Sequence, residues 1–174
     1  METASEEEQR FREFAHGSTA RLLRTAFLLT LDRHLAEDLV QEALARVYSH
    51  WPRLYREVNL HAYTYRVLVN TNLNWHRRRR VVELLGSVLP ERVERADAAE
   101  QTAQRSALLA ALAELPPRQR ATVVLRYWED LAEEEVARIM GCSVGNVKSQ
   151  ASRALAKLRT DPRLDGLAPT TMAS

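Results

Sequence analysis

Apolar residues recur along most of this chain at spacings of three and four, which is the period of an amphipathic α-helix. There is no sustained alternation of apolar and polar positions, so we predict an all-α fold. In the first half we expect three helices, the first of them long and loosened near Gly17. The second runs from about His34 to Trp51, is capped by Asp32 and is stopped by Pro52. The third runs from about Leu60 through Arg80, and its apolar side consists of Tyr63, Val67, Leu68, Thr71 and Trp75.

The helical pattern weakens between residues 81 and 104. This stretch contains Gly86, Pro90 and five acidic residues against two arginines, and it has little hydrophobic periodicity. Such a composition is typical of a flexible linker. We therefore expect two small helical domains, at residues 1–80 and 105–160, joined by this acidic linker and followed by a short tail at 161–174.

The second half has breaks that divide it into four helices. Pro116-Pro117 can end a helix near residues 106–115 and begin the next one, which we expect near residues 118–128. Two shorter periodic segments, 133–140 and 144–159, flank Gly141-Cys142-Ser143. Glycine tolerates a positive φ and serine caps helices, so this tripeptide predicts a sharp turn between two crossing helices. The pattern is that of a helix-turn-helix.

The last of these helices has a buried stripe and a polar face. The expected stripe is Val147, Ala151, Leu155 and Leu158, and the opposite face carries Asn146, Lys148, Ser149, Gln150, Ser152 and Arg153. Those polar side chains are of the types that pair with base edges and phosphates in the major groove. The alternative is a plain helical hairpin with a solvated basic face. Cys142 has no second cysteine or nearby histidine, so we interpret it as a packing residue.

Two further faces are candidates for binding. The helix ending near Arg80 carries Asn70, Asn74 and Trp75 before the run Arg77–Arg80, a combination suited to unpaired DNA; the alternative is a core helix with a solvated basic end. The helix before it exposes Asp38, Gln41 and Glu42, an acidic face that repels DNA and could contact a protein or merely be solvated.

The distribution of charge along the chain is more informative about binding partners than the overall composition. The 174 residues hold 25 Lys+Arg and 23 Asp+Glu, so the net charge is only +2, yet four arginines stand together at 77–80 and five acids at 129–135. Segregated blocks indicate surfaces with different partners. A single cysteine and the absence of a basic, apolar leader favour a cytoplasmic protein, and the longest apolar run, Ala107–Ala113, predicts no membrane insertion.

These motifs together resemble the extracytoplasmic-function sigma factors of the sigma-70 family, in a subfamily similar to actinobacterial sigma-E. Residues 36–48 resemble the polymerase-binding segment, residues 66–80 the promoter-melting helix, and residues 115–127 with the helix-turn-helix the C-terminal DNA-binding domain. The resemblance covers roughly residues 10–160. It rests on three motifs in order.

The resemblance implies a role for each face. Core RNA polymerase would bind Asp38, Gln41 and Glu42 through the clamp helices of its β′ subunit, and its β flap is a further expected contact. Promoter DNA would be held by two sets of residues: Asn70, Asn74, Trp75, Arg77 and Arg78 at the minus-ten element, and Asn146, Lys148, Ser149, Ser152 and Arg153 at the minus-thirty-five element. The stretch 52–60 would be a loop that takes a flipped base, and an anti-sigma factor is a candidate further partner.

Other functions are weighed against this one. A stand-alone helix-turn-helix regulator would bind paired half-sites as a dimer, but no dimerisation heptad is evident. An enzyme is disfavoured because there is no phosphate loop or nucleophile motif, and the five histidines have no metal-ligand spacing. We expect no cofactor and no bound metal.

Overall fold

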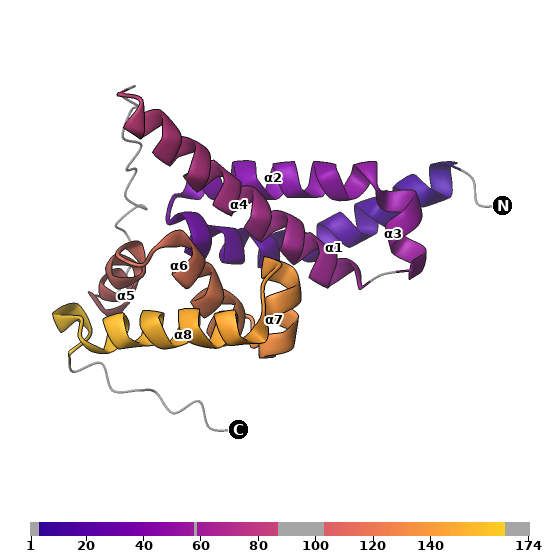
Figure 1. Cartoon of the computed structure of the whole chain (residues 1–174). Coiled ribbons are helices and arrows are strands. Elements are labelled where there is room, and N and C mark those ends of the chain that lie inside the picture. Colours follow the sequence, from indigo (N-terminus) through magenta and orange to yellow (C-terminus); the bar gives the residue numbers. More distant parts are fainter. Residues whose placement is uncertain (1–3, 58, 87–102, 166–174) are drawn as a thin grey trace.

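The computed structural model describes residues 4–57, 59–86 and 103–165, and these residues form helices and short turns only (Figure 1). The first half contains four α-helices: α1 (Ala4–Thr30), α2 (Arg33–Ser49), α3 (Trp51–Glu57) and α4 (Leu60–Leu84). The second half contains α5 (Ala103–Ala113), α6 (Pro117–Val123) with a π-helical continuation (Val124–Trp128), α7 (Glu133–Met140), α8 (Val144–Arg159) and a 3₁₀ turn (Pro162–Leu164). The predicted all-α class is confirmed.

Local capping explains where several helices begin. The carboxylate of Asp32 accepts a hydrogen bond from the backbone N–H of Leu35 at 2.8 Å, so the predicted cap of α2 is confirmed. Asn59, which the sequence reading did not identify, caps α4 in the same way through the N–H of Ala62 at 3.2 Å. Each side chain satisfies a backbone donor that has no partner within its own helix.

Three expectations about the first half were wrong. The first helix does not loosen at Gly17; α1 continues to Thr30. Pro52 does not stop a helix; it lies in the first turn of α3, where its missing N–H costs no hydrogen bond. The stretch 52–60 is consequently helical through Glu57 instead of being a loop.

The boundary between the first half and the linker also differs from the prediction. Helix α4 runs on to Leu84, four residues into the stretch assigned to the linker, because Val81 and Val82 prolong a helix that the arginines do not interrupt. Most of the predicted linker, residues 87–102, and most of the tail, residues 166–174, lie outside the described residues. The predicted limits of the two domains stay predictions.

One apolar core extends through both halves. It joins side chains of α1, α2 and α4 with side chains of α6, its π-helical continuation, α7 and α8, including Leu29, Leu39, Leu68, Leu125 and Val147. Helix α4 packs against α2 and also against α7. This second partner explains why the buried face of α4 is broader than the predicted stripe: Leu68 and Thr71 are buried as expected, and so are Thr64, Tyr65, Val69 and Asn72.

Polar contacts reinforce the packing of the halves. The guanidinium of Arg120, in α6, donates to the carbonyl oxygen of Leu29 near the end of α1 at 3.0 Å. The carboxylate of Glu129, which follows the π-helical turn, pairs with Arg21 of α1 at 2.6 Å and accepts a hydrogen bond from Thr25. The side chain of Glu129 is 2% exposed, so the carboxylate of this ion pair is shielded from water.

Candidate nucleic-acid and protein interfaces

The helix-turn-helix is built as the sequence predicts. Gly141 ends α7 with φ 62° and ψ 41°, a left-handed conformation that glycine adopts without strain. The hydroxyl of Ser143 then accepts from the N–H of Asn146 at 3.1 Å and starts α8. Cys142 is half-buried against the core, in agreement with its interpretation as a packing residue. The two helices are therefore held at a sharp angle by local chemistry.

Helix α8 has a buried apolar side and an exposed polar side. Val147, Ala151 and Ala154 are buried, whereas Leu155 of the predicted stripe is only half-buried. Of the predicted DNA-binding residues, Asn146, Lys148, Ser152 and Arg153 are exposed and Ser149 is half-buried. Lys148 lies 3.6 Å from Glu133 at the start of α7, an exposed ion pair of small energetic value. The polar side chains remain available to a ligand.

The predicted residues of α4 divide into free and engaged side chains. Asn74, Arg77 and Arg78 are exposed and Asn70 is half-buried. Trp75 is half-buried against the core, and its indole N–H donates to the carboxylate of Glu42 at 3.2 Å. The packing of Trp75 orients its ring and leaves only part of it open for stacking.

The acidic face of α2 divides in a similar way. Asp38 and Gln41 are exposed. Glu42 accepts hydrogen bonds from Trp75 and from Arg46, the latter at 2.6 Å, so it links α2 to α4. Of the three residues predicted to bind polymerase, Asp38 and Gln41 are thus the more available.

Packing of the two halves brings the polar sides of α4 and α8 to one groove, which sequence spacing alone does not reveal. The groove is lined by Asn70, Leu73, Asn74, His76, Arg77, Arg79, Arg80 and Glu83 of α4, by Pro116, Pro117, Arg118 and Gln119 at the start of α6, and by Gln150 and Arg153 of α8. Residues predicted for two different promoter elements therefore face a shared space. Arg118 was not among the predicted site residues.

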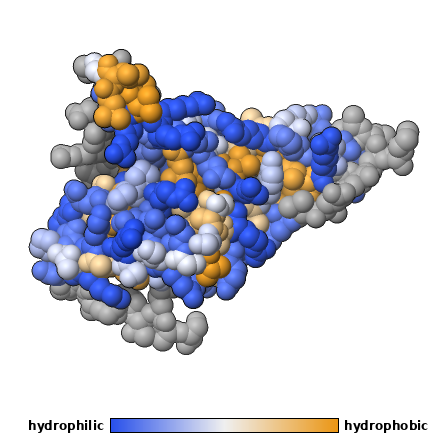
Figure 2. Space-filling view, viewed as in Figure 1, coloured by the Kyte–Doolittle hydropathy of each residue, from blue (hydrophilic) through white to orange (hydrophobic). Residues whose placement is uncertain are grey.

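An apolar patch follows this basic region at the end of α4. Val81, Leu84 and Leu85 are exposed there and form the orange tip in Figure 2. The exposed end of α4 is therefore basic along Arg77–Arg80 and apolar beyond it.

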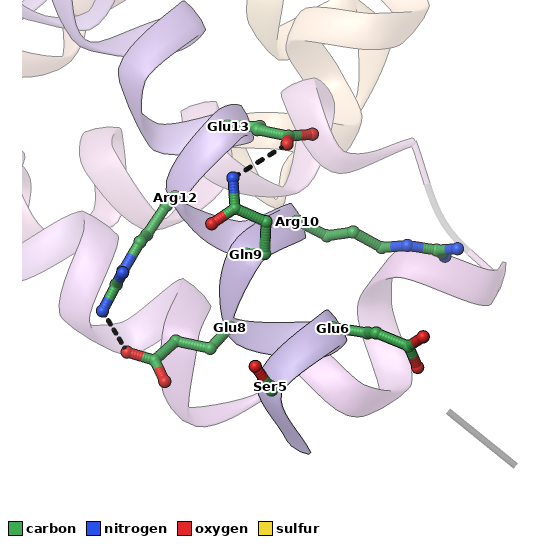
Figure 3. Close-up of a pocket in the computed structure, with 7 residues that line it drawn as sticks. All are labelled: Ser5, Glu6, Glu8, Gln9, Arg10, Arg12 and Glu13. Carbon is green, nitrogen blue, oxygen red and sulfur yellow. Dashed lines mark hydrogen bonds and ion pairs between the residues drawn. The ribbon is translucent and has the colours of Figure 1, made fainter. Parts of the chain in front are cut away.

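Another hollow lies along the start of α1, where Figure 3 shows seven polar side chains. They fan outward from one helix, and the marked contacts, Arg12 to Glu8 at 2.6 Å and Gln9 to Glu13 at 3.0 Å, run along that same helix. Because the side chains do not converge on a common point, this hollow offers no binding site. Elsewhere in the described ranges, no group of histidine, cysteine and carboxylate side chains could hold a metal ion.

The buried contact between the halves changes the acidity of one side chain. Tyr65 of α4 is 4% exposed and lies under the Arg21 guanidinium, whose central carbon is 5.8 Å from the ring centroid. Burial and the carboxylate of Glu129 raise the pKa of Tyr65 to about 12 from 10.0. The folded protein therefore favours the neutral phenol.

This shift predicts a specific loss of stability in base. Because the folded pKa lies above the unfolded one, the contribution of Tyr65 is complete below pH 10 and disappears as the pH rises toward 12. Its size is at most about 3 kcal/mol, since each pKa unit corresponds to about 1.4 kcal/mol. Urea unfolding between pH 8 and pH 11.5 should therefore show a steeper decline for the native protein than for Tyr65→Phe. Tyr127→Phe, at an exposed position, is the matched control, and equal slopes for native and Tyr65→Phe proteins would contradict the prediction.

Comparison with known proteins matches both halves to one family. Residues 18–82 match sigma-70 region 2, and residues 105–158 match sigma-70 region 4. The RNA polymerase sigma-E factor of Streptomyces coelicolor is 42% identical over 151 residues, which cover 87% of this chain and 85% of that protein. The sigma-E factor of Streptomyces antibioticus is 43% identical over 152 residues, covering 87% and 83% respectively.

Solved structures agree with this match. The sigma factor RpoE of Bartonella quintana, crystallised with the anti-sigma factor NepR, superposes with a TM-score of 0.75 at 27% identity and covers 90% of this chain and 99% of that one. CnrH, solved with the cytosolic domain of CnrY, superposes with a TM-score of 0.63, covering 87% of this chain and 86% of that one; at 19% identity it shows the shared fold alone. No helix in the described ranges has the length and apolarity that a membrane span requires.

Proposed function

Because this chain belongs to the extracytoplasmic-function sigma factors of the sigma-70 family, which direct RNA polymerase to promoters, we propose that its exposed faces divide that task. Asp38, Gln41 and Glu42 on α2 contact the β′ clamp helices of core polymerase. The half containing α5 to α8 contacts the β flap as well as DNA. The protein acts in the cytoplasm, where polymerase is found.

Two faces are assigned to DNA. On α4, Asn70, Asn74, Trp75, Arg77 and Arg78 hold and melt the minus-ten element, and on α8, Asn146, Lys148, Ser149, Ser152 and Arg153 hold the minus-thirty-five element. The observation that carries this assignment is the exposed polar side of α8 above a buried apolar side, within a capped helix-turn-helix. Amide and guanidinium groups match base edges and phosphates.

The packed arrangement restricts how the faces are used. Two elements about 25 base pairs apart are separated by about 85 Å along B-form DNA, since each pair rises about 3.4 Å. Arg77 and Arg153, by contrast, line one groove. Binding both elements at once therefore requires the two halves to separate, and core polymerase is the partner that holds them apart.

The central experiment is run-off transcription from a promoter recovered by selection. Initiation should require both core polymerase and this chain. The proposal fails if the chain binds its promoter tightly as a dimer without core polymerase and never directs initiation, which is the behaviour of a stand-alone regulator. Mapping transcription starts after overexpression would then identify both promoter elements.

Substitution of Asp38 tests the polymerase face separately. Asp38 is exposed and the structure shows no hydrogen bond or ion pair for it among the described residues, so Asp38→Ala should leave the fold intact and weaken binding to core polymerase by about tenfold. The affinity can be measured by fluorescence anisotropy of the labelled chain. Glu37→Ala, on the same helix, is the matched control. Unchanged affinity of Asp38→Ala would remove this face from the polymerase interface.

The structural relatives suggest one more partner. RpoE and CnrH were solved with NepR and with the cytosolic domain of CnrY, and NepR is an anti-sigma factor. We include an anti-sigma factor among the proposed partners of this chain on that similarity. Co-purification of the chain from its own host, followed by loss of run-off activity on adding the captured protein, would test it.

A further inference from the structure

The groove between α4, α6 and α8 exists only because the two halves are packed together. Its volume is about 960 Å³, within the range of small-molecule sites. One wall comes from α4 and the other from the start of α6 and from α8. A ligand that touches both walls would bind the packed arrangement and not the separated one.

Unpaired positive charge is the main chemical feature of this groove. Arg77 and Arg80 enter it from α4, Arg118 from α6 and Arg153 from α8. Within residues 4–57, 59–86 and 103–165, none of these four guanidinium groups has an ion pair. Among the described residues that line the groove, Glu83 is the only acidic one, and it already pairs with Arg79 at 3.2 Å. Packing therefore brings like charges together, at an electrostatic cost that an anion would remove.

The pKa of His76, whose imidazole lies in the α4 wall of the groove, responds to this positive charge. His76 is half-buried and lines the groove. Burial lowers its pKa, and the charges of Arg120 and Arg79 lower it further. An anion bound in the groove would oppose those charges and move the pKa of His76 upward, which makes the imidazole a built-in probe of occupancy.

The remaining lining limits the kind of anion. Asn70, Asn74 and Gln150 supply amide groups, and Leu73 with the two prolines supplies small apolar surfaces. Among the described residues, no phenylalanine, tyrosine or tryptophan lines the groove, whereas grooves for single-stranded nucleic acids use such rings to stack the bases. A guanidinium group can donate two parallel hydrogen bonds to the oxygens of one phosphate group. A compact phosphate chain could accept such bonds from arginines on both walls of the groove.

We propose that this groove is a binding site for a compact polyphosphate, either inorganic or carried by a nucleoside, which bridges α4 to α6 and α8 and holds the two halves together. The ligand binds only the packed state, so it shifts the population toward that state by mass action. Its effect on transcription rests on the proposed function, because Arg77 and Arg153 are also assigned to promoter DNA. Polyphosphate would then inhibit initiation by occupying those residues and by opposing separation.

Calorimetric titration of the full chain with sodium tripolyphosphate tests the site without DNA or polymerase. We expect saturable binding of one equivalent, and affinity reduced by about tenfold in Arg118→Gln, because one charge-assisted contact is lost. Arg118 is exposed and lies outside the residues assigned to DNA or polymerase. Arg24→Gln removes an exposed arginine of α1 that does not line the groove, and it should bind like the native protein.

Titrations with other anions distinguish an inorganic polyphosphate from one that is carried by a nucleoside. Guanosine triphosphate without magnesium should bind at the same groove; affinity equal to that of tripolyphosphate assigns recognition to the phosphate chain, and tighter binding adds contacts to the nucleoside. Sodium sulfate at matched ionic strength should not compete. No binding of tripolyphosphate, equal loss in Arg118→Gln and Arg24→Gln, or full competition by sulfate would each overturn the proposal.

Two further readouts distinguish this site from nonspecific attraction. Nuclear magnetic resonance titration of the His76 imidazole should show a higher pKa in saturating tripolyphosphate, and an unchanged pKa would place the anion elsewhere. In run-off transcription at fixed free magnesium, tripolyphosphate should inhibit the native chain more than Arg118→Gln. Equal inhibition of both would reject the regulatory role, while normal transcription without tripolyphosphate would leave the sigma-factor assignment unaffected.

Discussion

Arg120→Ala should lower the free energy of unfolding by about 3 to 5 kcal/mol, the largest effect we expect from one substitution. The side chain is 7% exposed, and its guanidinium donates hydrogen bonds to four carbonyl oxygens: those of Leu112 at 2.9 Å, Leu29 at 3.0 Å, Ala113 at 3.1 Å and Leu115 at 3.3 Å. Three lie at or just beyond the end of α5 and one near the end of α1. A single group thus donates to carbonyl oxygens at the ends of two helices, and among these four only the oxygen of Leu112 also accepts from a backbone N–H, that of Leu115 at 3.1 Å.

The buried position makes this arginine hard to replace. Alanine would remove a donor from each of the four oxygens and would open a cavity between the halves; the oxygen of Leu112 would keep its bond from the backbone N–H of Leu115, and the other three would lose the donor they have. Burial lowers the pKa of Arg120, yet a guanidinium stays charged in a protein, so the hydrogen bonds persist over the accessible pH range. Arg120→Lys should recover only part of the loss, because an ammonium has three donors in a compact group instead of a planar fork.

Urea denaturation of Arg120→Ala, Arg120→Lys and the native chain measures this effect. Arg118→Ala, two residues away and exposed, is the matched control and should change the free energy of unfolding by less than about 0.5 kcal/mol. A loss of under about 1 kcal/mol in Arg120→Ala would mean that water replaces the guanidinium at little cost, and that Arg120 contributes little to holding α5, α6 and α1 together.

The second large effect is expected on DNA binding. Arg153→Ala should weaken binding to the minus-thirty-five element by about 1 to 3 kcal/mol if its guanidinium reads a base. Arg153 is exposed on the polar side of α8 and has no ion pair among the described residues, so its removal should not disturb the fold. Binding of the holoenzyme to promoter fragments with single substitutions in the element would measure both the loss and the change in base preference.

The same helix supplies the control. Lys157→Ala removes an exposed charge one turn further along α8, outside the predicted recognition set, and should weaken binding to all fragments only slightly. An equal loss on every fragment with Arg153→Ala would reassign Arg153 to a phosphate. Unchanged binding would remove it from the DNA-facing side.

Much of the second half was predictable because its signals are local. Glu133–Met140 and Val144–Arg159 have the predicted bounds, since a left-handed glycine and a capping serine act within a few residues of the chain. The first half was predicted less well. Nothing within a few residues of Pro52 distinguishes a proline that stops one helix from a proline that lies in the first turn of the next.

Contacts between distant segments were beyond the reach of periodicity. A narrow stripe on α4 predicts one neighbour, whereas α4 packs against both α2 and α7 and buries a broader face than the predicted stripe. Arg120 lies in a motif that the sequence reading associated with DNA binding, yet its side chain closes the ends of α5 and α1. The contact between Arg120 and Leu29 joins residues 91 positions apart in the sequence, and the spacing of residues along one helix cannot reveal such a contact.

By itself, the sequence determined the helices, the turn between α7 and α8 and the kinds of side chains on each polar face, because these depend on neighbours three or four residues apart. The tertiary structure decided which faces meet. Burial of apolar surface between the halves drew α4 and α8 to opposite walls of one groove and placed four arginines there without acidic partners among the described residues. The small net charge of the whole chain contains no sign of that local excess, which arises only from packing.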